Sequence, residues 1–92
     1  MQASVIELLT TLGWIVTVTD AGHQLKRARR LPKGWPDLVA YRKERYLLIE
    51  CKSPTGELRP DQVELHARLA RHGVPVHVVR DVAELSRILR DL

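Results

Sequence analysis

Asp37, Glu50 and Lys52 are the residues of this sequence whose types and spacing are best suited to chemistry. Asp37 opens one apolar segment, and Glu50 and Lys52 lie at the end of the next. Side chains two positions apart on a strand share a face, so Glu50 and Lys52 point together and Cys51 points to the other side. If the two segments pair as a hairpin about Lys43-Glu44, Asp37 lies level with Glu50. Two carboxylates and an amine are therefore expected to meet at one end of a sheet.

Such a cluster is suited to binding a divalent cation beside a phosphate. Two carboxylates within a few ångströms repel each other unless a proton or a cation lies between them. Their hard oxygens favour Mg²⁺ or Mn²⁺, with the backbone carbonyl of Cys51 as a candidate third ligand beside Asp37 and Glu50. Lys52 could activate or orient the attacking water, or neutralise charge that develops on the phosphate. The trio therefore favours phosphodiester hydrolysis.

Each half of the trio also has an ordinary structural explanation. An aspartate that follows a proline often serves only to form a turn at the start of a strand. A glutamate and a lysine two residues apart on a strand can be a surface ion pair, worth about 0–1 kcal/mol. Their occurrence together, between the expected strands and just after a basic segment, favours the chemical interpretation.

The basic segment lies directly upstream of Asp37. Fifteen Lys and Arg residues against eleven Asp and Glu give a net charge of +4, and no acid occurs between residues 21 and 36. That stretch contains Lys26, Arg27, Arg29, Arg30 and Lys33. Because residues 20–35 show no regular period, we expect a long, mobile loop that contacts phosphates. A solvated charged face without a partner is the alternative.

Periodicity and turn residues predict an α/β domain around these residues. Apolar spacing of three and four indicates helices, and β-branched or continuous apolar runs bounded by turn residues indicate strands. The expected order is αβββαβα, in one domain that covers residues 1–92. The segments are a helix over 2–12, strands over 14–19, 37–42 and 45–52, a helix over 60–72, a strand over 74–79 and a helix over 82–92.

Composition narrows the class of protein. Apolar residues make up 45% of the chain and aromatic residues 4%, so the core must be aliphatic. One cysteine excludes an internal disulfide framework and a cysteine zinc cluster. Without a membrane-length apolar run or the features of a signal peptide, we expect a cytoplasmic, nucleoid-associated protein. A small core and an apolar last helix favour a homodimer.

Three segments resemble a known family. Gly34-Trp-Pro-Asp-Leu38, Ile49-Glu-Cys-Lys52 and the Gly56–Gln62 segment, with its Leu58 and Pro60, are similar to motifs of the PD-(D/E)XK nuclease superfamily. Within it, the chain most resembles the virus-type replication-repair nuclease (VRR-NUC) domain, in the small stand-alone form found in phages and bacteria. The resemblance implies a restriction-endonuclease-like αβββαβ core with a mixed central sheet flanked by helices. Here a C-terminal helix would be added.

The resemblance also implies roles for individual residues. Asp37 and Glu50 would be the metal-binding carboxylates, Lys52 the catalytic lysine, and Gln62 the glutamine of the helix near the site. The helical pattern independently places Gln62 on the same stripe as Leu65, facing the sheet, where an amide needs a polar partner. A glutamine at a helix start that bonds only to nearby backbone is the alternative.

The first helix departs from the family pattern. Relatives often carry an acid early in this helix, which completes the metal site. Here the only acid is Glu7, about 200° around the helix from Val5 on the apolar stripe, while Gln2 occupies the stripe. The missing acid therefore leaves the affinity for the metal and the number of bound ions undetermined. The predicted reaction is still phosphodiester hydrolysis.

These observations together predict a Mg²⁺- or Mn²⁺-dependent DNA endonuclease without a small-molecule cofactor. Since phosphate contacts do not read bases, we expect selectivity for DNA structure, as in the Holliday-junction resolvases that the stand-alone relatives resemble. One alternative is a nucleic-acid-binding module of the same fold without catalysis. Another is a small interaction or antitoxin-like domain whose basic loop folds on an acidic partner. Two carboxylates on a phosphate path argue against both, because they repel DNA unless a cation neutralises them.

Overall fold

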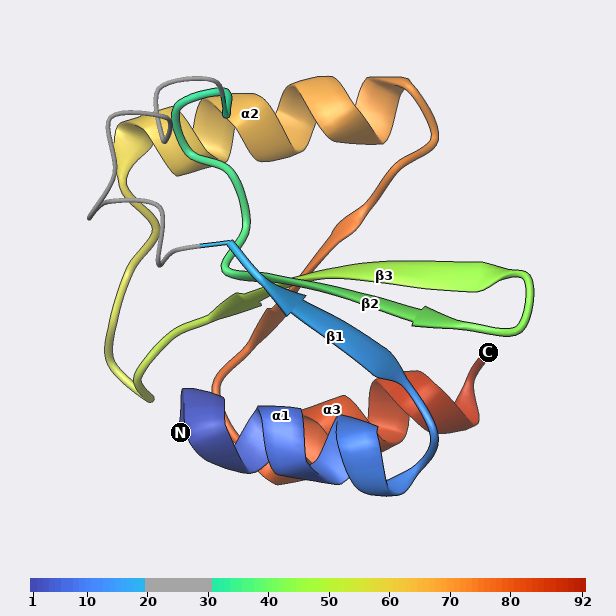
Figure 1. Ribbon diagram of the computed structural model, residues 1–92. Helices are drawn as coiled ribbons and strands as arrows, with labels where there is room; N and C mark the ends of the chain where they lie inside the picture. Colours follow the sequence, from blue (N-terminus) through green and yellow to red (C-terminus); the bar gives the residue numbers. More distant parts are fainter. Residues whose placement is uncertain (20–30) are drawn as a thin grey trace.

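The computed structural model describes residues 1–19 and 31–92, which form an α/β domain in the predicted order (Figure 1). The element ends differ from the predicted ones by up to two residues. Over the described ranges, the elements are α1 (Gln2–Thr11), β1 (Ile15–Val18), β2 (Leu38–Arg42), β3 (Arg45–Cys51), α2 (Pro60–Arg71), β4 (Val76–Val79) and α3 (Val82–Arg90). Most of the predicted basic loop, including Lys26, Arg27, Arg29 and Arg30, lies outside the described residues.

The four strands form one mixed sheet in the order β1-β2-β3-β4. The pairs β1–β2 and β2–β3 are antiparallel, and β3–β4 is parallel. The β2–β3 hairpin turns at Lys43-Glu44, where Lys43 adopts a φ of 56°. Leu38 pairs with Ile49, so that Asp37, one residue before, and Glu50, one residue after, lie at the same end of the hairpin. The predicted register is therefore correct.

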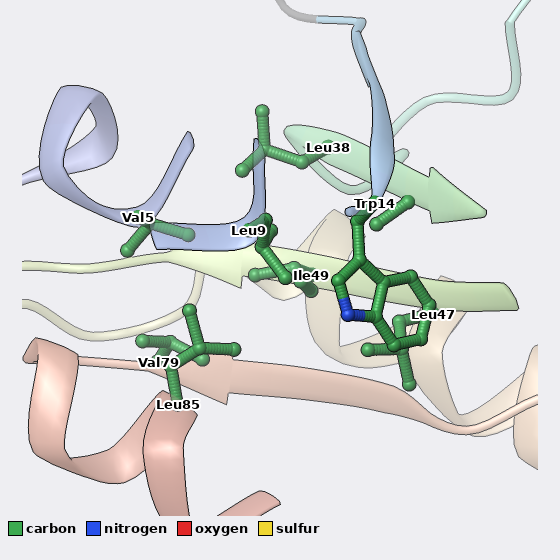
Figure 2. Packing of buried hydrophobic residues seen from close by; sticks show 9 residues of the cluster. Val5, Leu9, Trp14, Leu38, Leu47, Ile49, Val79 and Leu85 are labelled. Atoms are coloured by element: carbon green, nitrogen blue, oxygen red, sulfur yellow. The ribbon is translucent and has the colours of Figure 1, made fainter. Parts of the chain in front are cut away.

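Helices cover both faces of this sheet (Figure 1). α1 and α3 lie side by side on one face, and α2 lies on the other. The main core fills the space between the sheet and the α1–α3 pair (Figure 2), as the aliphatic composition predicted. Its members are Val5, Leu9, Trp14, Leu38, Ala40, Leu47, Ile49, Val79 and Leu85. Alternation along β3 points Leu47 and Ile49 into this core and turns Glu50 toward α2.

The apolar run at the centre of β3 is covered on both faces only in part. A continuous run such as Tyr46 to Ile49 is typical of a strand buried on both faces, and Leu47, Leu48 and Ile49 are buried. Tyr46 is 51% exposed, and Tyr41, its partner on β2, is 44% exposed. α2 therefore does not cover this face near the hairpin turn.

No helix within the described ranges is long and apolar enough to span a bilayer.

Candidate active site

Asp37 is fixed against the end of β3 by a backbone hydrogen bond. The N–H of Cys51 donates to Oδ2 of Asp37 over 3.0 Å, and the side chain is half-buried. On the other side, the N–H of Thr19 donates to the backbone carbonyl of Asp37 over 2.8 Å. These contacts tie the start of β2 to both neighbouring strands, and they hold one carboxylate oxygen in place.

Glu50 is the buried member of the site. It is only 2% exposed, because it points from β3 beneath the first turn of α2. Its Oε2 accepts a hydrogen bond from Nε2 of Gln62 over 3.0 Å and lies 3.8 Å from Nζ of Lys52. The structure thus brings Glu50, Lys52 and Gln62 together, with Asp37 at the adjacent position.

The other oxygen of Glu50 has no such support. Oε1 is buried and has no hydrogen-bond partner among the described residues. Burial, and then the negative charge of Asp37, raise the pKa of Glu50 to about 7, although Lys52 and Gln62 act in the opposite direction. Two ionised carboxylates placed side by side repel each other, so the pair is stabilised by a shared proton or by a cation.

This donor set fits a hard divalent cation. Asp37 and Glu50 would hold it, and the backbone carbonyl of Cys51 remains the predicted third ligand. Over the described ranges, no group of three or more His, Cys, Asp or Glu side chains is arranged to hold a metal. Glu7 is exposed and Gln2 is half-buried, in agreement with the sequence pattern of the first helix. A backbone or substrate oxygen would therefore have to complete the coordination.

Gln62 is held at both ends of its amide. Oε1 accepts from the backbone N–H of Arg59 over 2.9 Å as part of a capping box, and Nε2 donates to Glu50. The predicted polar partner in the sheet and the alternative bond to nearby backbone therefore occur together. Because the Arg59 bond takes the amide oxygen, only the NH₂ group can face Glu50. The cap of α2 thus orients the donor that supports the carboxylate.

Replacing Gln62 with alanine should lower stability as well as weaken the site. The change leaves the N–H of Arg59 and Oε2 of Glu50 without their amide partner, at a cost of about 1–3 kcal/mol. For a domain of this size we expect the Tm in EDTA to fall by roughly 5–15 °C. Thermal unfolding followed by circular dichroism would measure it. Val63→Ala, at an exposed neighbour on the same helix, is the control, and an equal loss in both variants would contradict this role of Gln62.

His66 is a residue of the site that the sequence did not reveal. Its Nε2 is buried and has no hydrogen-bond partner among the described residues. Burial, and then the nearby charge of Lys52, lower the pKa of this imidazole. His66 follows Gln62 by four residues and therefore shares its helical face. The spacing of four residues from Gln62 is the sequence signal that could have placed His66 near the site.

Arg80 is the second residue that the sequence did not reveal. Its Nη2 donates to the carbonyl of Gly56 over 2.7 Å, in the turn that follows Lys52. The N–H of Lys52 donates to the carbonyl of Val79 over 3.0 Å. The end of β4 therefore fixes both the backbone of Lys52 and the next turn. No sequence pattern marked Arg80, because the contact depends on the parallel pairing of β3 and β4.

Lys33 is the member of the predicted DNA-binding group that lies within the described residues. It is exposed and lines a small depression of about 290 Å³ with Asp61, Glu64 and Arg68 of α2. Beside it, Gly34 packs directly on the backbone of Asp61. The loop that leads to Asp37 is thus docked on the same helical turn that carries Gln62.

A nuclease-type α/β fold is defined by this mixed sheet between helices, with two carboxylates and a lysine at one end. The family model for the VRR-NUC domain matches residues 6–83, so the chain belongs to the VRR-NUC domain family. Such domains are generally nucleases that act on DNA and are typically metal-dependent. The resemblance and the fold class predicted from sequence are therefore confirmed.

Two similar proteins accompany the family match. A solved structure described as a VRR_NUC domain protein is 21% identical, with a TM-score of 0.62, over 83% of this chain and 65% of that one. That likeness concerns the fold. The carbamoyl phosphate synthase large chain of Rhodopirellula baltica is 32% identical over 81 residues, which is 87% of this chain. The chain spans only 8% of that protein's length.

Proposed function

We propose that this protein is a metal-dependent DNA endonuclease whose centre is formed by Asp37, Glu50 and Lys52. The observation that carries the proposal is the state of Glu50. It is buried beside a second carboxylate, its pKa is raised to about 7, and its Oε1 is left without a partner among the described residues. Carboxylates whose pKa is raised by burial and by a neighbouring carboxylate cluster at functional sites.

Among the described residues, the side chains around Glu50 contact only one of its two carboxylate oxygens. Gln62 and Lys52 both engage Oε2, so Oε1 is the oxygen that remains for a Mg²⁺ or Mn²⁺ ion shared with Asp37. Such an ion supplies Lewis acidity at the phosphate and charge neutralisation. Lys52, whose side chain is 15% exposed, is held by Glu50 where its ammonium can orient the attacking water or stabilise charge on the phosphate oxygens.

The proposed substrate is branched DNA, cut by two copies of the chain acting on opposite strands. A cluster of Lys and Arg side chains supports this choice, since such side chains contact the DNA phosphates and do not read the bases. These residues are Lys26, Arg27, Arg29, Arg30 and Lys33. A dimer would also add buried area to a small domain. We place its action in the cytoplasm, on nucleoid or phage DNA.

A second candidate is a DNA-binding module of the same fold without catalysis. The observation that favours it is the pair of carboxylates, which no third acidic or histidine side chain joins within residues 1–19 and 31–92. Both candidates predict salt-sensitive DNA binding. Only cleavage separates them.

Cleavage of end-labelled duplex, flap, single-stranded and four-way-junction DNA in Mg²⁺, Mn²⁺ or EDTA tests the proposal. We expect metal-dependent cutting that Lys52→Ala lowers by about 10³-fold, because the variant loses the cation at the developing charge. Arg71→Ala, which removes an exposed cation at the end of α2, should cut normally. Paired nicks confined to the junction would support a resolvase. No cutting of any substrate, with salt-sensitive binding intact, would leave the binding module.

A further inference from the structure

A second cavity lies at the end of the sheet opposite the carboxylates. Its volume is about 660 Å³, and it is lined by the hairpin turn and by the last turns of α1 and α3 (at the right of Figure 1). The residues from the hairpin are Arg42, Lys43 and Arg45. Because Asp37 and Glu50 lie at the other end of the same strands, this cavity is separate from the proposed active site.

The floor of the cavity is apolar. Leu8 and Leu12 come from the α1 side, Leu89 and Leu92 from the α3 side, and Trp14 lies between them. Leu12 and Leu92 are each 46% exposed. Leaving such surface in water forgoes about 25 cal/mol for each Å². Leu12 and Leu92 therefore carry apolar surface that a bound partner could bury.

The rim of the cavity is cationic. Arg42, Lys43, Arg45 and Arg90 line it, and all four are exposed. Across the described part of the chain, none of these four forms an ion pair, and no acidic side chain lines the cavity. The cavity therefore combines a hydrophobic floor with a cationic rim.

We propose that this cavity binds an acidic amphipathic segment of a partner protein, with apolar side chains on the floor and Asp or Glu side chains against the rim. Charge complementarity selects this occupant. DNA phosphates would satisfy the four cations, but the apolar groups of a duplex, mainly its thymine methyls, lie in the major groove and not beside the phosphates that would face the rim. A second copy of the chain that docked through this same face would bring the same four cations to the interface, where they would repel.

The cavity is large enough to take several apolar side chains. Pockets for drug-sized ligands enclose about 300–1,000 Å³, and its volume of about 660 Å³ lies in that range. An amphipathic helix presents apolar anchors three and four residues apart with charged residues at their sides. Leu8 and Leu12 on the α1 side and Leu89 on α3 are the floor residues that such anchors would contact.

Selection from a library of random peptides displayed on phage, with the full chain as the target at physiological salt, tests the proposal. We expect the recovered peptides to combine leucine, isoleucine or phenylalanine with flanking acids. The Arg42→Glu/Arg45→Glu variant changes only exposed side chains and should weaken the binding of these peptides by about tenfold or more. Leu12→Asp, which puts a charge on the apolar floor, should also weaken their binding. Arg68→Glu/Arg71→Glu makes an equal charge change on α2 and should leave their affinity unchanged.

The two tryptophans provide a second measurement. Trp14 lines the cavity, whereas Trp35 lies two residues before Asp37 at the other end of the sheet. Titration of a selected peptide should shift the indole N–H signal of Trp14 and leave that of Trp35 in place. The proposal is overturned if no acidic amphipathic peptide is recovered, or if the rim variant binds the peptides as the α2 variant does. It also fails if the rim variant selectively loses DNA binding or changes the oligomeric state.

Discussion

Glu50→Gln should abolish DNA cleavage and at the same time stabilise the metal-free protein above pH 7. The carboxylate is buried beside Asp37, and desolvation and repulsion make its charged form costly. Glutamine keeps the shape and still offers an oxygen to Nε2 of Gln62. Its NH₂ group can donate toward Asp37, where the carboxylate Oε1 has no partner among the described residues. The variant therefore removes a buried charge without leaving a cavity.

The raised pKa of Glu50 determines how the stability of the wild type changes with pH. The pKa of Glu50 is about 7 in the folded protein and near 4.5 in the unfolded chain. Between these values the folded state binds a proton that the unfolded state does not, so the free energy of unfolding falls as the pH rises from about 4.5 to 7. A tenfold difference in proton affinity is worth about 1.4 kcal/mol, so a shift from 4.5 to about 7 corresponds to a loss on the order of 3 kcal/mol. Glutamine, which does not titrate, should lack this loss.

Chemical denaturation in EDTA across this pH range, with the wild type beside Glu50→Gln, measures the difference. Glu64→Gln, at an exposed position of α2, is the matched control and should follow the wild type. Adding Mg²⁺ should restore stability to the wild type at pH 8 and leave the Glu50 variant unchanged. A wild type whose stability rises with pH, in parallel with the glutamine variant, would show that Glu50 is not a destabilising charge.

The sequence predicted the ends of the hairpin well, because they follow from local rules. A two-residue turn at Lys43-Glu44 fixes the register, and the register alone places Asp37 level with Glu50. The period of two then decides that Glu50 points away from the core and Cys51 toward it. Helical spacing likewise placed Gln62 against the sheet, where it is 2% exposed.

The sequence could not predict contacts that depend on how elements pack. The bond from Arg80 to Gly56 requires the parallel approach of β4 to β3, and nothing in the order of residues reports that pairing. The burial of Nε2 of His66 depends on how closely α2 packs on the sheet. The exposure of Tyr46 has the same origin, since apolar runs indicate burial but not how far a covering helix extends.

Gly34→Ala should be among the most destabilising single-methyl changes in this chain. Gly34 has a φ of +90°, a region that side chains rarely adopt. A Cβ built there would lie 2.4 Å from the carbonyl oxygen of Asp61 and 3.0 Å from the backbone nitrogen of Gln62. Backbone atoms at a helix start cannot move aside as a flexible side chain would. Either the loop before Asp37 must lift from α2, or the first turn of α2 must shift.

Both responses damage the site as well as the fold, because the loop leads into Asp37 and the helical turn carries Gln62. We expect the free energy of unfolding to fall by about 2–4 kcal/mol and cleavage to fall with it. Gly73→Ala separates the two causes, since Gly73 also has a positive φ of 77° but nothing within 4 Å of the place that an added methyl would occupy. Urea denaturation of both variants measures the difference. If Gly73→Ala is as destabilising as Gly34→Ala, backbone conformation explains the whole effect, and the close packing of this loop on α2 contributes nothing to it.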